Sequence, residues 1–130
     1  MQNMSTGKSA LGMDGNVTAL IGYLIGIVAL VLVFIEKDNK FVRFHALQSV
    51  FWSLACAAAM IALVVVGGAL TWIVGVASGT LAFLTGGVIG LLYLIVIIGL
   101  VGGLIYAAIK SYGGQQFKLP FVGNFAEKFV

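Results

Sequence analysis

The stretch IEKDNKFVRFHALQ, residues 35–48, carries five of the eleven charged side chains of this 130-residue chain, together with its single histidine. It separates two apolar runs, residues 16–35 and 46–109, and the longer run contains no Asp, Glu, Lys, Arg or His. A short charged break between oily segments is typical of a loop that joins two membrane-crossing helices. The stretch therefore decides the predicted fold, because it marks where the chain leaves the lipid and enters it again.

The composition excludes an ordinary soluble domain. The chain is 62% hydrophobic and 8% charged, whereas about a quarter of the residues in soluble domains are charged. In lipid the backbone must be satisfied within helices or a closed barrel, and the sequence lacks the alternating segments of about ten residues that build a barrel. We therefore predict an all-α, polytopic helical membrane protein of the cell inner (cytoplasmic) membrane.

The spacing of the apolar runs predicts three transmembrane helices and a shorter element. Twenty residues, as in 16–35, cross a hydrocarbon core of about 30 Å. The glycine pairs Gly67-Gly68 and Gly86-Gly87 divide the longer run into three segments, 46–66, 69–85 and 88–109. The outer two are long enough to span, whereas 69–85 is short and forms either a re-entrant or interfacial segment or a fourth helix.

The positions of Lys and Arg favour three spans over four. With three spans, the loop 36–45 and the C-terminal tail lie on one side of the membrane, and only Lys8 lies opposite. With four spans, the basic residues are divided almost evenly between the two sides. Because cytoplasmic segments carry an excess of Lys and Arg, we expect the loop and the C-terminus to be cytoplasmic and 69–85 to be re-entrant.

Three regions follow: a flexible N-terminal tail (1–14), a transmembrane helical domain (15–112) and an amphipathic C-terminal tail (113–130). In the last region phenylalanine recurs every four residues, at Phe117, Phe121, Phe125 and Phe129. Asn124 and Glu127 have the spacing of a helix capping box. We expect a short amphipathic helix from about residue 124 onward, which anchors the C-terminus at the membrane surface or docks it onto a partner.

The charged stretch also leads into the second predicted span. Asp38 or Asn39 can cap a helix there, and one face of that helix then carries Phe41, His45, Gln48 and Trp52. Polar groups at membrane depth face the bundle or water, because lipid leaves them unpaired. We therefore expect His45 and Gln48 to point inward and to bond a neighbouring helix, or backbone near Glu36.

Glu36 and Arg43 are predicted to form an ion pair that locks the turn between the first two spans. The alternative is a proton or ligand site built on Glu36, Arg43 and His45, and we favour the structural role. No metal site is predicted, since a metal needs three or four ligands and the chain has one histidine and one cysteine, Cys56. We also predict no catalytic set, no cofactor and no phosphate-binding loop.

Two blocks of the sequence, FIEKDNKFVRFHALQS and YGGQQFKLPFVGNFAEKF, match a known signature. They resemble the signature of a large group of small, functionally uncharacterised bacterial and archaeal membrane proteins, related to the Tic-twenty-like component of the chloroplast inner-envelope protein import machinery. The signature positions that we take as candidate structural residues are Glu36, Lys40, Phe41, Arg43, Phe44, His45, Gln48, Lys118, Pro120 and Glu127. The resemblance implies a multi-span helical fold and, by remote analogy, a part in protein translocation. The chain departs from compact members by an insertion near 69–85.

The predicted function is that of a non-enzymatic accessory or assembly subunit of a larger membrane complex, of protein translocation type by the resemblance. Its expected partners are the lipid bilayer and other membrane subunits or further copies of itself, with no nucleic acid. The alternative is a small homo-oligomeric channel or transporter that uses the stripe of His45 and Gln48. Residues 46–109 contain no ionisable group of the kind that ion-coupled transporters usually carry in the membrane.

Overall fold

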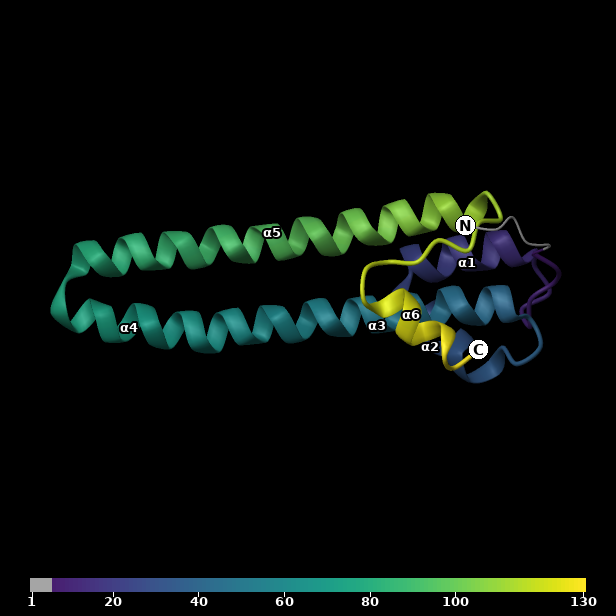
Figure 1. The fold of residues 1–130 in the computed structure, drawn as a ribbon, viewed down its shortest axis with the longest axis horizontal. Helices are drawn as coiled ribbons and strands as arrows, with labels where there is room; N and C mark the ends of the chain where they lie inside the picture. Colours follow the sequence, from purple (N-terminus) through teal and green to yellow (C-terminus); the bar gives the residue numbers. More distant parts are fainter. Residues whose placement is uncertain (1–5) are drawn as a thin grey trace. The chain divides into compact units, whose positions relative to one another are not determined.

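The computed structural model describes residues 6–130, and this part of the chain is 78% helix and contains no strand. The elements along the chain are α1 (Gly15–Leu24), α2 (Gly26–Ile35), α3 (Lys40–Ala62), the π-helical turn η1 (Leu63–Gly67), α4 (Gly68–Ala77), α5 (Gly79–Tyr112) and α6 (Val122–Glu127) (Figure 1). The predicted all-α fold is confirmed. The chain divides into two compact units, which we call the terminal unit (Met1–Ser53 with Val101–Val130) and the hairpin unit (Leu54–Leu100).

The first apolar run folds back on itself instead of forming one long helix. The helical backbone breaks at Ile25, where φ is −122° and ψ is 94°. After this break α2 packs against α1, so that a Cβ added to Gly22 would lie 3.6 Å from Leu32 Cδ1 and 3.8 Å from Ala29 Cβ. Each helix has ten residues and is about 15 Å long. Neither helix alone is long enough to cross a membrane.

Two helical stretches of the described residues are long and apolar enough to cross a membrane: Lys40–Ala77, with 38 residues, and Gly79–Tyr112, with 34. The prediction of three spans with a short fourth element is therefore wrong. The chain reverses at Ser78, whose φ of −160° and ψ of 122° end the helical geometry. This turn lies inside the segment 69–85 that the sequence suggested as a single element.

The glycine pairs do not interrupt the helices. Gly67 ends the π-helical turn and Gly68 begins α4, so the helical path continues, while Gly86 and Gly87 lie within α5. A helix satisfies its backbone hydrogen bonds internally, and in a membrane no water competes for them, so glycine is tolerated there. These two glycine pairs therefore do not end a helix, whereas the pair Gly113-Gly114 directly follows the last residue of α5.

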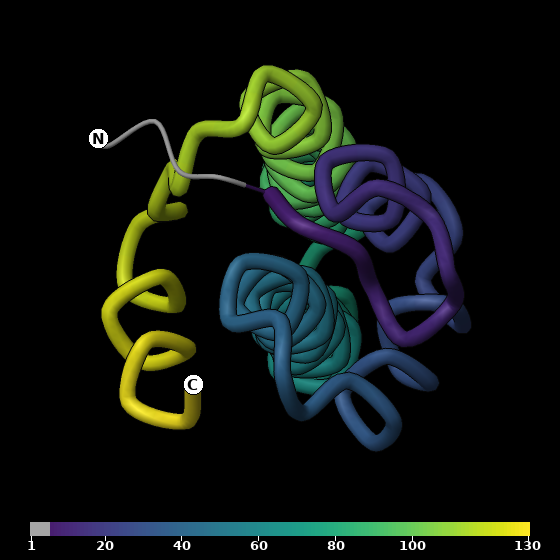
Figure 2. The backbone as a smooth tube through the Cα atoms, turned by 90° about the vertical axis from the view of Figure 1, so that its right-hand side faces the viewer, coloured from purple at the N-terminus to yellow at the C-terminus, as the bar shows by residue number. Residues whose placement is uncertain are grey.

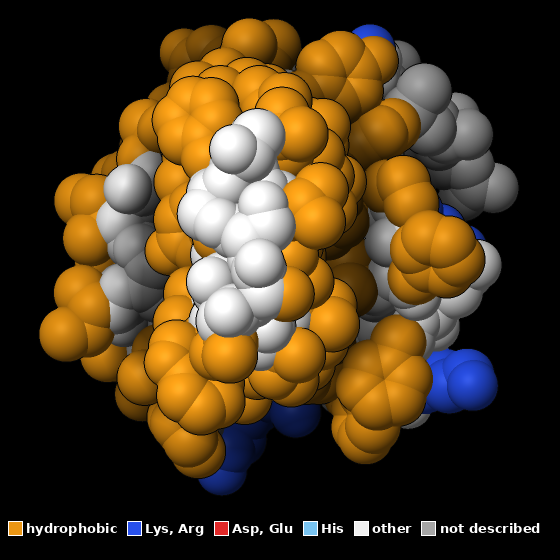
Figure 3. All heavy atoms as spheres, turned by 90° about the vertical axis from the view of Figure 1, so that its left-hand side faces the viewer, with side chains coloured by type: hydrophobic (Ala, Val, Ile, Leu, Met, Phe, Trp, Pro, Cys, Tyr) orange, Lys and Arg blue, Asp and Glu red, His pale blue; other side chains and the backbone are white. Residues whose placement is uncertain are grey.

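The hairpin unit consists of two antiparallel helical segments, one before and one after Ser78, which we call its legs. The legs pack against each other through small residues. An added Cβ on Gly67 would lie 2.6 Å from Ile89 Cγ2, which shows how closely the legs approach. Gly75 meets Ala82 in the same way, with an added Cβ at 3.3 Å. The outside of the unit is apolar and open: no residue of α4 is buried, and hydrophobic side chains dominate the face at the turn (Figure 3).

The core of the terminal unit is centred on the first turns of α3. Buried residues there form three clusters: Ala19, Leu32, Phe41, Val42 and Ala46; Tyr23, Ala107, Ala108 and Leu119; and Phe44, Leu47 and Ala126. These clusters join α3 to the α1–α2 pair and to α6, and join α1 to α5 and the tail. Figure 2 shows the C-terminal tail on one side of α3 and the α1–α2 pair on the other.

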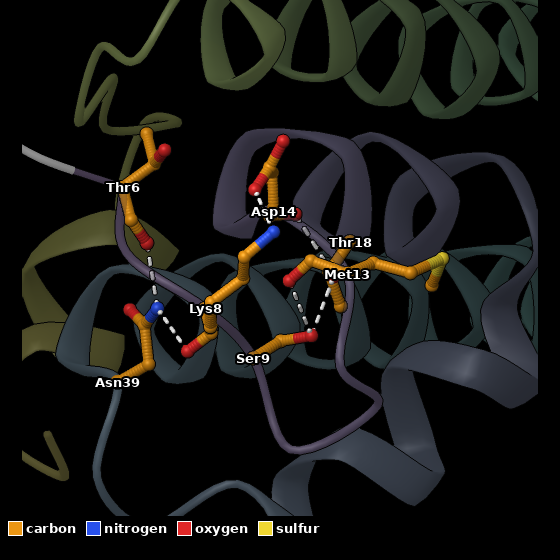
Figure 4. A network of polar contacts seen from close by, with 7 residues as sticks. All are labelled: Thr6, Lys8, Ser9, Met13, Asp14, Thr18 and Asn39. Carbon is orange, nitrogen blue, oxygen red and sulfur yellow. Dashed lines mark hydrogen bonds and ion pairs between the residues drawn. The ribbon is translucent and has the colours of Figure 1, made fainter.

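The segment before α1 packs onto the loop between α2 and α3 (Figure 4). The Asn39 side-chain amide donates to the carbonyl oxygens of Thr6 (2.6 Å) and Lys8 (3.0 Å). Lys8 forms an ion pair with Asp14 at 2.6 Å. The tail 1–14 was predicted to be flexible; its first five residues lie outside the described part of the chain, and the rest makes these contacts.

Candidate functional site

The most concentrated polar chemistry of the terminal unit lies around Gln48, which has no exposed surface. Its amide nitrogen donates to the hydroxyl oxygen of Tyr23 (2.7 Å) and to the carbonyl oxygen of Phe117 (2.9 Å). Its amide oxygen accepts a hydrogen bond from the backbone N–H of Leu119 (2.8 Å). One side chain of α3 therefore ties α1 and the C-terminal tail together, and both of its amide hydrogens are used.

His45 extends this network by one step. Its Nδ1 atom lies 2.8 Å from the Tyr23 hydroxyl. Since the Gln48 nitrogen can only donate, the Tyr23 oxygen accepts from Gln48 and its own hydrogen points at Nδ1. His45 Nδ1 is then an acceptor, which assigns the ring hydrogen to Nε2.

His45 is buried in the core, with 1% of its surface exposed. Phe41 and Phe44 meet it edge-on, with ring centroids 4.5 Å and 5.1 Å away. Nε2 makes no hydrogen bond of standard geometry with the described residues, although the ring interacts with the backbone of Gln115. The histidine thus contacts α1 on one side and the start of the C-terminal tail on the other.

The network confirms that His45 and Gln48 point inward and bond a neighbouring helix. The helix is α1, and the remaining partners belong to the tail rather than to the backbone near Glu36. The arrangement serves a structural role, because the Gln48 amide is hydrogen-bonded on both its nitrogen and its oxygen and buried, satisfied polar groups of this kind fix one packing arrangement. As the structure stands, neither side chain faces solvent or lines an open path.

The turn between α2 and α3 uses Glu36 and Arg43 in a different way from the predicted ion pair, which is wrong. The Glu36 carboxylate is 2% exposed and accepts from the backbone N–H groups of Ala10 (2.6 Å) and Asn39 (3.1 Å). Arg43 instead donates to the Glu36 carbonyl oxygen (2.9 Å) and to the Phe129 carbonyl oxygen (3.1 Å). A buried carboxylate needs hydrogen-bond donors, and here the N-terminal segment supplies one.

The start of α3 confirms one of the two predicted caps. Asn39 Oδ1 accepts a hydrogen bond from the backbone N–H of Val42 at 3.2 Å, the geometry of an N-cap. Asp38 and Lys40 flank it on the exposed surface. The candidate residue Lys40 therefore lies outside the network around Gln48.

The C-terminal tail is held closely against this network. Gly123 packs so tightly that an added Cβ would lie 2.6 Å from Lys118 Cβ and 2.8 Å from Gln48 Oε1. Lys118 also forms an ion pair with Glu127 at 2.7 Å, between partly exposed side chains. Such exposed pairs contribute little to stability, so the glycine packing and the Gln48 bonds hold the tail.

The predicted C-terminal helix begins earlier and is shorter than expected. α6 starts at Val122 and lacks a side-chain cap, so the capping box of Asn124 with Glu127 is wrong, and Glu127 pairs with a lysine instead. The expected aromatic face does form. Phe125 and Phe129 lie side by side and both contact Phe51 of α3.

Two members of the site were not found from the sequence. Tyr23 lies in the first apolar run, and a phenol there was a signal that a polar partner lies nearby. Ser49 donates to the carbonyl oxygen of Gly22 at 3.1 Å, which fixes the same end of α1. Both residues bring α1 to the side chains of α3 that the sequence had already indicated.

Comparison with known proteins identifies the family. A family model described as the magnetosome magnetite crystal formation protein family matches residues 9–126, which include Gln48 and all of its partners. The chain belongs to this family. No solved structure matches it.

Relatives of this family member are described as membrane proteins. A UPF0132 membrane protein of Methanocaldococcus jannaschii is 32% identical over 126 residues, covering 95% of this chain and 94% of the relative. A second one from that organism is 30% identical and covers 92% and 73%. One from Archaeoglobus fulgidus is 32% identical and covers 91% and 97%. Together with the two long apolar helices, these matches support a membrane location; the relation to the Tic-twenty-like component stays a prediction.

Proposed function

We propose that this family member is a non-enzymatic assembly subunit that binds another membrane protein through its hairpin unit. One observation carries the proposal: several glycines of this unit have open space where a side chain would lie. A Cβ would meet nothing within 4 Å at Gly68, Gly79, Gly87, Gly90 or Gly99. In a membrane, outward small residues let a second helix approach closely, and such packing drives helix association.

Two shallow grooves on the same unit add shape to this surface, and both include Val64 and Tyr93. The first is lined by Ala57, Met60, Ile61, Val64, Val65 and Tyr93. The second is lined by Leu63, Val64, Gly86, Ile89, Gly90 and Tyr93. No charged side chain lines either groove, which suits an apolar helix rather than a hydrophilic ligand.

The identity of the partner rests on two leads. The resemblance of the signature blocks to the Tic-twenty-like component supports a complex of protein translocation type. The description of the family names magnetosome magnetite crystal formation. A subunit that binds through a lipid-exposed hairpin serves either kind of complex. A channel that uses His45 and Gln48 is less favoured, because the tail closes over both side chains.

Photo-crosslinking in native membranes tests the proposal. A benzoyl-phenylalanine replaces Tyr93, which lines both grooves, or Phe83, which is 79% exposed outside them. We expect one stoichiometric protein adduct at Tyr93 and none at Phe83. An adduct with a different protein identifies a hetero-complex, whereas an adduct of twice the mass identifies self-association. Equal or absent labelling at the two aromatic positions would refute binding through the grooves.

The proposal includes an orientation in the inner membrane. α1 and α2 form one fold-back and the two long helices form another, so the chain returns to the same side each time. The polar ends also meet: the Asn16 side chain donates to the Tyr112 carbonyl oxygen at 3.0 Å. All seven basic residues then lie on one side, and the positive-inside rule makes that side cytoplasmic: Lys8, Lys37, Lys40, Arg43, Lys110, Lys118 and Lys128. This differs from the sequence-based arrangement, which placed Lys8 opposite.

A further inference from the structure

Phe121 combines a strained backbone with an exposed aromatic side chain. Its φ of 65° and ψ of −52°, with a hydrogen bond from the Val122 N–H to the Pro120 carbonyl oxygen at 2.7 Å, form a classic γ-turn. This turn is rare and strained for a bulky L-residue. The side chain is nevertheless 92% exposed. Strain of this kind persists where the surrounding structure enforces it, and it marks functional positions.

The turn between α1 and α2 is a second exposed apolar feature. We call this turn and Phe121 the two tips. Leu24 is 61% exposed, Ile25 50% and Ile27 70%. Turns facing water usually contain Gly, Pro, Asn, Asp or Ser, whereas this one is formed by large aliphatic side chains around a single glycine. Its composition suits an apolar surrounding.

Both tips stand at the same level along α3, because the same side chain holds them. Gln48 bonds the hydroxyl of Tyr23, which directly precedes Leu24, and the backbone N–H of Leu119, two residues before Phe121. This is also the level at which charge ends on both long helices. The last charged residue on α3 is Arg43, and the first on the return helix α5 is Lys110.

We propose that this level is the edge of the membrane and that both tips insert into the lipid–water interface. From Gln48 to Ala77 the helix runs for 30 residues, or about 45 Å, which matches a bilayer of about 40–45 Å with its headgroups. Lys118 precedes Phe121 by three residues and Lys110 follows the uncharged part of α5, so their ammonium groups are placed to meet lipid phosphates. The occupant is lipid because the tips continue the apolar surface of the helices that cross the membrane.

The role of the tail follows from this placement. The Gln48 bonds and the Gly123 packing hold residues 117–123 in place, which reduces the loss of chain entropy when Phe121 inserts into the membrane. This inference goes beyond the assembly role, since it concerns contact with lipid and holds whether or not a protein partner exists. Phenylalanine is among the side chains with which interfacial segments enter the boundary between headgroups and acyl chains.

The test uses the full-length protein with Cys56→Ala as background, in nanodiscs of mixed phosphatidylcholine and phosphatidylglycerol. Single variants Phe121→Cys and Ile27→Cys carry an environment-sensitive fluorophore. Asn124→Cys, on the exposed surface of α6, is the matched control for Phe121, and Lys37→Cys is the control for Ile27. Quenching by aqueous iodide is compared with quenching by lipids that carry a spin label high on the acyl chain.

We expect blue-shifted emission and strong lipid quenching at both tips, and iodide quenching at both controls. Iodide quenching at Phe121 and Ile27 would overturn the proposal, as would equal lipid quenching at each tip and its control. Protection from iodide that appears in native membranes but not in nanodiscs would also overturn it, because a protein would then cover the tips. All four labelled positions are at the surface, so the fold is expected to persist.

Discussion

Replacing Gln48 by leucine removes three hydrogen bonds from the centre of the terminal unit while keeping a side chain of similar size. The bonds to the Tyr23 hydroxyl, the Phe117 carbonyl and the Leu119 N–H are all lost. At about 0.6 kcal/mol per bond, a typical value within membranes, the loss is about 2 kcal/mol. At about 1 kcal/mol per bond it is about 3 kcal/mol.

The effect should be local to the tail, and hydrogen exchange measures it directly. The Leu119 N–H is 2.8 Å from its acceptor in the wild type. In Gln48→Leu it loses that acceptor, so its exchange should accelerate by roughly thirtyfold to a hundredfold, since each 1.4 kcal/mol is a factor of ten. Amides in the middle of α5 serve as internal controls, because they belong to the hairpin unit and not to the terminal unit that contains Gln48.

Tyr23→Phe provides the matched variant. It removes the hydroxyl that links Gln48 to His45 and leaves the two bonds between Gln48 and the tail. We expect a loss of about 1 kcal/mol and little change in exchange at Leu119. The double variant should lose less than the sum of the two single losses, because both remove one shared bond. Wild-type exchange at Leu119 in Gln48→Leu would refute the reasoning.

Three further predictions concern thermal unfolding in mild detergent. Arg43→Ala should lower the melting temperature by about 2–6 °C, because it removes donors to three main-chain carbonyls, those of Val33, Glu36 and Phe129; an unchanged melting temperature would exclude that role. Gly123→Ala should destabilise the protein by about 1–3 kcal/mol through overpacking and should speed proteolysis of the tail, whereas Gly113→Ala meets only ordinary contacts and should be tolerated. Gly67→Ala should disturb the packing of the hairpin legs, whereas Gly68→Ala faces open space; equal melting temperatures for this pair would contradict the described leg packing.

Local periodicity made part of the site predictable from sequence. The inward position of His45 and Gln48 follows from one helical face entering an apolar run, where unpaired polar groups are costly. The cap at Asn39 follows from its place before that helix. The pairing of Phe125 with Phe129 follows from their spacing of four. In each of these cases neighbours in the sequence determine the outcome.

The remaining features depend on contacts between distant residues, which no local pattern encodes. Residues 16–35 are long enough for a span, and only the packing of Gly22 on Ala29 and Leu32 shows that the run folds back. The Glu36 carboxylate finds its donor at Ala10, 26 residues away. The opposite charges of Glu36 and Arg43 near a turn suggested an ion pair, but backbone N–H groups bind the Glu36 carboxylate instead.

The distance in sequence between Gln48 and its last partner has a consequence for biosynthesis. The Leu119 N–H that it binds is 71 residues further along the chain. While a ribosome is still adding the tail, the helices are already made but the Gln48 amide lacks its final donor. Closure of the terminal unit therefore waits until Leu119 has been synthesised, and a product truncated before Leu119 leaves the Gln48 amide oxygen without this donor.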